Sequence, residues 1–165
     1  REYAHHAKPL HGDDQPERTL CLTMNGEVIS KVDLFPRKVS VGKDSWNLLG
    51  VGGVWTSSAH RRRGHATSLL IQARSIAAKE KGVAGTILFS LENLVPYYES
   101  NGYQRHTGVV TMQQPVAIDA REVLHGPPVP PMKKVVVPEQ VAVMTFLIAE
   151  WFDPQEVLNI EGIPW

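Results

Sequence analysis

The chain has 165 residues, of which 42% are hydrophobic and 21% charged, and its formal net charge is zero. This composition predicts one globular domain over residues 1–165 with a sizeable buried core and an irregular N-terminal segment at 1–18. No apolar stretch reaches the roughly 18 residues that span a membrane. The single cysteine, Cys21, excludes an internal disulfide and suits a reducing compartment, so we expect a cytoplasmic protein without membrane contacts.

The charged residues are divided unevenly along the chain. Residues 1–86 carry 13 Lys and Arg against 8 Asp and Glu, whereas residues 87–165 carry 4 against 9. If the fold brings both halves to one cleft, one side favours an anionic ligand and the other a cationic one. An ordinary solvated surface explains the same imbalance, and both interpretations stay open. We expect no nucleic-acid partner, because the wider basic surface and aromatic platform that such binding needs are missing.

The first half of the chain has the pattern of three strands. Alternating apolar residues predict strands at 19–25 and 28–35, joined by the tight turn that Asn25-Gly26 marks. Pro36 is expected to end the second strand. A third strand is predicted at 46–56, and its glycines indicate a bulge or a backbone that a ligand approaches closely.

The second half begins with a long helix over 63–81, whose apolar residues form one stripe and which Gly82 ends. Further elements are predicted in this order: a strand at 86–91, a short helix at 94–100, a strand at 109–112, a proline-rich loop at 126–131, a strand at 141–148 and an acidic tail at 150–165. Together they suit an α/β domain with a mixed (α+β) sheet. A pocket is expected where neighbouring strand ends part, near the start of the long helix.

That helix start has the features of an anion site. A glycine-broken strand runs into a basic loop, Arg61-Arg62-Arg63, and the loop opens directly into the helix, whose first N–H groups have no internal partner. Gly64 and Ala66 keep bulky side chains away from the main chain. A Walker A loop is absent from the sequence. We expect a pyrophosphate site here, although an ordinary helix start with a solvated basic turn fits the same residues.

Two motifs resemble those of one enzyme family. Arg61-x-x-Gly64-x-Ala66 resembles the Arg/Gln-x-x-Gly-x-Gly/Ala signature of the GNAT superfamily of acetyl-CoA-dependent N-acyltransferases. The segment Val95–Tyr103 resembles the aromatic-Tyr-Glu-x-x-Gly-aromatic element that follows in that family. A finer similarity, in Ile87–Glu99, Gln114-Pro115 and the C-terminal Leu158–Trp165, is to the branch of aminoglycoside 2'-N-acetyltransferases.

The resemblance implies a GNAT-like fold, in which a central, mostly antiparallel sheet has a splayed strand pair and is flanked by helices. It also implies acetyl-CoA as cosubstrate and a set of residues that bind it. The pantetheine arm would pair with the strand end, and the pyrophosphate would lie on the loop and helix start. These cofactor-binding residues are Val54, Trp55, Thr56, Arg61, Arg62, Arg63, Gly64, His65, Ala66 and Thr67.

The resemblance also implies a general acid, Tyr98, which donates to the coenzyme A thiolate; Tyr97 is expected to face the core. The strand before the loop has no acid from Asn47 to Val54, so the usual glutamate base of the family is absent. Glu92 is our first candidate for the base, and His60, Asp153 and the carboxylate of Trp165 are alternatives. Asp153 and Trp165 are also candidate contacts of the substrate.

We therefore expect an N-acetyltransferase that transfers an acetyl group to a primary amine of a small, cationic molecule by direct attack in a ternary complex. Peptide or protein amine acetylation and a non-catalytic acyl-CoA-binding module are the alternatives. No metal is expected, because His5, His6 and His11 lack a carboxylate–histidine framework. The protein is expected to be a monomer or a homodimer.

Overall fold

The computed structural model describes residues 16–115, 132–138, 140–148 and 153–161, in which nine strands form one sheet. The strands are β1 (Arg18–Met24), β2 (Glu27–Val41), β3 (Asp44–Thr56), β4 (Val83–Leu91), β5 (Gln104–His106), β6 (Val110–Pro115), β7 (Met132–Val136), β8 (Val141–Leu147) and β9 (Leu158–Glu161). The helices are α1 (His65–Lys79) and α2 (Val95–Ser100), with short 3-10 turns at η2 (Ser58–His60) and η3 (Glu92–Leu94).

The sheet is mixed and mostly antiparallel, as the sequence predicts. Its order is β5-β8-β4-β3-β2-β9-β6-β7, and β1 pairs with β2 beside that path. Among the strands that the structure describes, only the pairs β3–β4 and β6–β9 are parallel. Since α1 connects β3 to β4, these two strands form a strand–helix–strand unit inside an otherwise antiparallel sheet.

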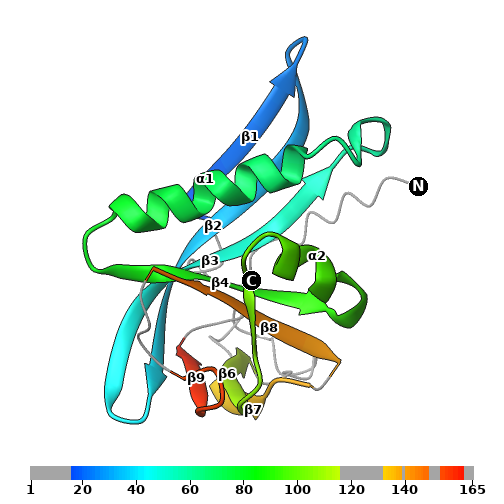
Figure 1. The fold of residues 1–165 in the computed structure, drawn as a ribbon. Coiled ribbons are helices and arrows are strands. Elements are labelled where there is room, and N and C mark those ends of the chain that lie inside the picture. Colours follow the sequence, from blue (N-terminus) through cyan, green and yellow to red (C-terminus); the bar gives the residue numbers. More distant parts are fainter. Residues whose placement is uncertain (1–15, 116–131, 139, 149–152, 162–165) are drawn as a thin grey trace, which may run out of the picture.

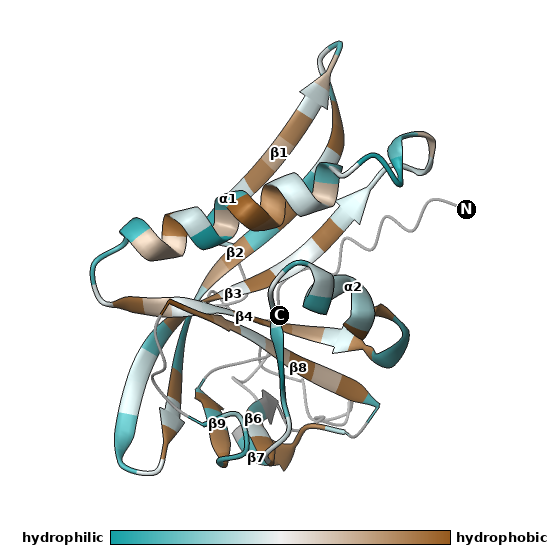
Figure 2. Cartoon of the chain, in the orientation of Figure 1, coloured by the Kyte–Doolittle hydropathy of each residue, from teal (hydrophilic) through white to brown (hydrophobic). Residues whose placement is uncertain are grey.

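The helix α1 covers one face of the sheet and packs against β1, β2, β3 and β4 (Figure 1). Its apolar stripe, shown in Figure 2, buries Leu69, Leu70, Ala73 and Ala77 against one core cluster. A second cluster includes Leu48, whereas its neighbour Leu49 belongs to the first. Because adjacent strand residues point to opposite faces, the two clusters lie on the two faces of the sheet.

The parallel strands β3 and β4 separate towards their C-terminal ends. Their pairing runs from Asn47 opposite Val83 to Gly50 opposite Ile87 and stops there. Beyond that point β3 continues to Thr56, and Figure 1 shows the two strands diverging with α2 between their ends. The strand end, the start of α1 and the helix α2 therefore surround one opening.

The glycines of β3 form the predicted bulge. Lys31 pairs with Trp55 and Asp33 pairs with Gly52, so two residues of β3 stand opposite one residue of β2. Gly53 has φ +54°, and a Cβ on it would lie 2.1 Å from Oδ2 of Asp33. Both its conformation and the lack of space demand glycine at this position.

The sequence-based end of the second strand at Pro36 is wrong. β2 continues to Val41, and Pro36 lies where β2 changes its outer neighbour: β1 pairs as far as Leu34, and β9 pairs from Lys38 onward. Among the described strands, none pairs with β2 at Pro36 on that side. A proline is tolerated there because it has no N–H to contribute to the ladder.

No strand was predicted in the acidic tail at 150–165, but its described part contains β9, which pairs with both β2 and β6. The short strands β5 and β7 were also missed. The expected irregular segment 1–18 and the proline-rich loop at 126–131 lie wholly or mostly outside the described residues, as do His5, His6, His11 and Trp165. Within the described part, neither helix is long and apolar enough to cross a membrane.

Candidate active site

A cleft of about 410 Å³ lies between the end of β3, the start of α1 and α2. The structure brings nine of the ten predicted cofactor-binding residues to its wall; Arg63 is the exception. Tyr98 and Tyr97 of α2, Leu94 and His60 complete the lining. The wall contains Val54, Trp55, Thr56, Arg61, Arg62, Gly64, His65, Ala66 and Thr67.

The start of α1 opens into this cleft without a cap. Gly64 holds the N-cap position with φ +77°, and no side chain accepts a hydrogen bond from the first turn. The first N–H groups of the helix are therefore available to a ligand. A Cβ on Gly64 would meet no atom within 4 Å, so its left-handed conformation, rather than crowding, requires glycine. Arg62 is also left-handed, with φ +61°, which turns the loop sharply into the helix.

The charges around this helix start are all of one sign. Arg61, Arg62 and Arg63 are exposed, and in the described part of the chain none of them has a carboxylate partner. Nε of Arg61 donates to the carbonyl oxygen of Thr56 at 3.1 Å, which ties the loop to the end of β3. The first turn contains no acid. Together with the helix dipole, this arrangement favours an anion such as a pyrophosphate.

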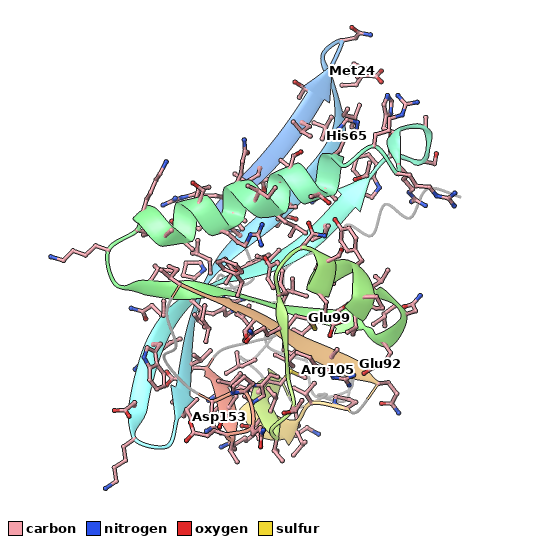
Figure 3. All side chains as sticks on the ribbon, viewed as in Figure 1. Met24, His65, Glu92, Glu99, Arg105 and Asp153 are labelled. Atoms are coloured by element: carbon pink, nitrogen blue, oxygen red, sulfur yellow. The ribbon has the colours of Figure 1, made fainter. Side chains whose placement is uncertain are left out.

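His60 and His65 extend the polar wall of the cleft. Their ring centroids are 6.4 Å apart, and Nδ1 of His60 lies 2.7 Å from Oγ of Ser57. His65 is the first residue of α1, and its Nε2 is buried without a hydrogen-bond partner in the protein (labelled in Figure 3). A nitrogen in this position needs a ligand or water to complete its bonding.

Tyr98 lines the cleft from α2. It is only 6% exposed, and its ring contacts those of Tyr97 and Tyr103 edge-on, with centroids 5.1 and 5.9 Å away. Burial, with smaller contributions from Tyr97 and Tyr103, raises the pKa of Tyr98 to about 12. The phenol therefore keeps its proton at neutral pH and can act only as a donor to a developing anion.

Tyr97 was expected to face the core, but Tyr98 is the more deeply buried of the two tyrosines. Tyr97 is half-buried, and its hydroxyl lies 3.4 Å from Oγ1 of Thr67 in the first turn of α1. Both tyrosines line the cleft. The single hydrogen bond to Thr67 links α2 to the helix that would hold the cofactor.

The position of α2 is fixed further by Arg74, which projects from the middle of α1. Nη1 of Arg74 donates to the carbonyl oxygen of Asn101, the residue that caps α2. The guanidinium also lies 4.6 Å from the ring centroid of Phe146 and 6.0 Å from that of Tyr103. These contacts hold Tyr98 at a defined distance from the anion site.

The candidate base Glu92 does not line the cleft. Its carboxylate forms a bidentate ion pair with Arg105 of β5, with contacts of 2.9 and 2.5 Å, and both side chains are exposed. Figure 3 shows this pair beyond α2, well separated from His65. Asp153 is exposed and lies beside the β6, β7 and β9 strands, where its Oδ1 accepts from the N–H of Gln155. Of the alternatives among the described residues, only His60 reaches the cleft.

A larger cavity, of about 690 Å³, lies at the other side of β8. Its wall is mostly valine, with the buried His106, whose Nε2 lies 2.8 Å from the carbonyl oxygen of Glu156. Burial lowers the pKa of His106. No helix start reaches this cavity among the described residues, and its one arginine, Arg105, is already paired with Glu92.

One acid near the cleft was missed at the sequence level. Asp33 lies in the middle of β2, is 8% exposed, and stands over the bulge of β3. The only signal in the sequence was an acid between two apolar residues, Val32 and Leu34, inside a predicted strand. Its neighbour across the sheet depends on the register of β2 and β3, which the sequence pattern does not specify.

Comparison with known proteins identifies the family of the chain. Residues 3–106 match the family model described as an acetyltransferase (GNAT) domain, which covers more than half of the chain. The chain therefore belongs to the GNAT acetyltransferase family. No curated protein sequence gives a significant match.

Several solved structures share the fold at low sequence identity. Eis1 from Mycobacterium abscessus is 23% identical with a TM-score of 0.51, covering 62% of this chain and 28% of its own. ElaA from Escherichia coli is 17% identical with a TM-score of 0.51, covering 82% and 73%. A GNAT acetyltransferase from Streptococcus pneumoniae is 15% identical with a TM-score of 0.50, covering 79% and 66%. The chain thus spans less than a third of the Eis1 structure, and these likenesses establish the fold alone.

Proposed function

We propose that this protein is an acetyl-CoA-dependent N-acetyltransferase that acetylates a primary amine of a small, cationic molecule in a ternary complex. The observation that carries the proposal is the single cleft in which an uncapped, basic helix start faces the bulged end of β3 and the phenol of Tyr98. The three features match the three parts of the cosubstrate: a pyrophosphate, an amide-bearing arm and a thioester.

The residues present fit such a ligand. The N–H groups at the start of α1, with Arg61 and Arg62, would hold the pyrophosphate, and the open space above Gly64 lets it approach the main chain. Between Val54 and Thr56, β3 has no β4 partner, so its backbone groups can pair with the amides of the pantetheine arm. The arm would then run from the anion site towards Tyr98.

The thioester supplies an activated acetyl group when acetyl-CoA is bound. The protein orients it and provides Tyr98, which keeps its proton because of its raised pKa and can hydrogen-bond the sulfur as negative charge develops there. Glu92, the first candidate base, would have to exchange its two contacts with Arg105 before it could take a proton. The aminoglycoside 2'-type branch remains our proposal for the acceptor class.

The test combines binding and turnover. Arg61→Ala with Arg62→Ala should weaken coenzyme A binding in calorimetry by about tenfold or more, because each removes a charged hydrogen-bond partner of phosphate. Lys79→Ala is the matched control: it removes an exposed cation from the last turn of the same helix, about 20 Å away, and should leave the affinity unchanged. Absence of binding at millimolar coenzyme A would refute the cofactor site.

For turnover, saturating acetyl-CoA is mixed with polyamines, aminoglycosides and lysine-containing peptides, and thiol release is followed. Release with the small cationic amines supports the proposal, and release only with peptides favours protein amine acetylation. The absence of an acid from Asn47 to Val54 favours a second candidate, a non-catalytic acyl-CoA-binding module. Tight acetyl-CoA binding without thiol release from any amine would establish that candidate instead.

A further inference from the structure

The strand that ends in the cleft has no acid between Asn47 and its end at Thr56, but the neighbouring strand supplies one. Asp33 of β2 pairs with Gly52 of β3 and is 8% exposed. Its Oδ2 lies 2.1 Å from the place where a Cβ of Gly53 would stand. The carboxylate of Asp33 therefore leans across β3 and occupies the space that the missing side chain leaves at the bulge.

This carboxylate lies on the face of the sheet away from α1. Val32 and Leu34 pack in the core cluster that α1 covers, so Asp33 between them points to the other face. Trp55, which pairs with Lys31, lies on that same face and is 43% exposed. Because Val54 packs against the α1 cluster and both Val54 and Trp55 line the cleft, the cleft reaches both faces of β3.

The two faces of β3 thus differ near the cleft: the arginine loop adjoins the α1 side, and the ion pair of Asp33 with Lys31 lies on the other side. On the α1 side, the arginine loop and the first N–H groups of α1 would bind the anionic part of a ligand. On the opposite side of β3, the acid is Asp33. A cosubstrate whose phosphates lie on the α1 side leaves the opposite face to the acceptor. The carboxylate nearest to the bulge on that face is the group that a cationic acceptor would meet.

Asp33 already binds a primary ammonium. Nζ of Lys31 lies 2.7 Å from Oδ2, and Oγ1 of Thr19 donates to Oδ1 at 2.7 Å. The Lys31 side chain is 41% exposed, whereas that of Asp33 is 11% exposed. The lysine ammonium can therefore move into solvent while the carboxylate stays in place, held by Thr19.

We propose that Asp33 binds the acceptor's primary ammonium beside the bulge and takes its proton, and that the ammonium of Lys31 occupies this position until the acceptor displaces it. This inference rests on the proposed acetyltransferase function. It names the acceptor as an alkylammonium slender enough to replace a lysine side chain over β3. It also assigns to β2 the acid that the cleft end of β3, from Asn47 to Thr56, lacks.

The proton balance is complete without a further reactant. One N–H bond of the ammonium breaks and its proton goes to Asp33, which frees the nitrogen lone pair. The nitrogen then bonds to the thioester carbonyl carbon, the carbon–sulfur bond breaks, and the electron pair stays on sulfur. The second nitrogen proton reaches the sulfur, with the Tyr98 hydroxyl as donor to it, and Asp33 returns its proton to solvent. The products are an amide, a thiol and one proton.

The experiment measures initial rates with the amine and acetyl-CoA varied separately. Asp33→Asn, which keeps the size of the side chain, should lower kcat/KM for the amine by about 100-fold or more. The Kd for coenzyme A, measured by calorimetry, should stay within about twofold. Lys31→Met should lower KM for the amine by about two- to fivefold, because an exposed internal competitor is removed. Lys38→Met is the matched control: it removes an exposed, ion-paired lysine of the same strand far from the bulge, and should change neither constant.

Asp33 also ties β1 to β2, so a structural role must be separated from a role in the reaction. Thr19→Val removes the hydroxyl that orients Oδ1 but keeps the charge; it should lower kcat for the amine by about tenfold, and it should also lower Tm, because the hydrogen bond between β1 and β2 is lost. An Asp33→Asn protein with a lower Tm and wild-type kcat/KM for the amine would overturn the inference and leave the acetyltransferase function intact. A wild-type protein that releases no thiol with any amine would overturn both.

Discussion

Removal of the Tyr98 hydroxyl should change how stability depends on pH. Burial raises the pKa of Tyr98 to about 12 in the folded protein, against 10.0 for an ordinary tyrosine. The neutral phenol is thus favoured by folding, and its contribution is fully present below pH 10 and lost as pH rises from 10 to 12. Two pKa units correspond to about 2.7 kcal/mol of unfolding free energy at full titration.

The assay is urea unfolding at several pH values between 9 and 11.5. Tyr98→Phe has no proton to lose, so its unfolding free energy should fall less steeply above pH 10 than that of the wild type, and the two curves should converge by about 2 kcal/mol. Tyr97→Phe removes a hydroxyl from the same helix and keeps Tyr98, so it should follow the wild-type slope. Tyr98→Phe should also lower kcat by about 100-fold or more with coenzyme A affinity unchanged. Parallel wild-type and Tyr98→Phe stability curves would refute the assignment of a buried, neutral phenol.

Three further substitutions test particular backbone and side-chain positions. Gly64→Ala should cost about 1–2 kcal/mol in urea unfolding, because only its φ of +77° opposes a side chain. Gly53→Ala should cost more than Gly64→Ala and should also raise KM for the amine, because its Cβ would displace the Asp33 carboxylate; equal costs at both positions would contradict the close approach. Burial lowers the pKa of His106, so the stability that its neutral ring contributes is present above pH 6.5 and is lost as pH falls below it. In thermal unfolding between pH 7.5 and 5, His106→Gln should therefore lose less stability on acidification than the wild type. An equal loss in both proteins would assign the pH dependence to other groups.

The sequence predicts the centre of this molecule because its signals there are local. Some twenty consecutive residues contain the basic loop, the apolar stripe of α1 and the glycine that follows it. Both boundaries of the predicted helix lie within two residues of the observed ones. The glycines of β3 likewise predict a bulge from the sequence of the strand itself. They do not predict which residue of β2 stands opposite the bulge. The mostly antiparallel sheet follows from the family motifs together with the alternation of β1 to β3.

The elements that were missed depend on distant partners. β9 has only Leu158 and Ile160 as an alternating pattern, and it is a strand because β2 extends past Pro36 to meet it. Pro36 is a strong breaking signal on its own, and its tolerance in β2 comes from the change of neighbour there. The position of Asp33 also depends on a distant partner. Asp33 lies over Gly53 because of the register in which β2 pairs with β3, and the sequence of neither strand alone predicts that register.

The early end of the β3–β4 ladder has a consequence for how the site could change over time. From Val51 to Thr56 the donors and acceptors on the β4 side of β3 are main-chain groups, which every amino acid possesses. A thioester carrier whose amides pair with these main-chain groups would be bound through the backbone of β3 rather than through particular side chains. Substitutions along the strand can then retune the acceptor while the carrier stays the same, so one scaffold can serve many amines.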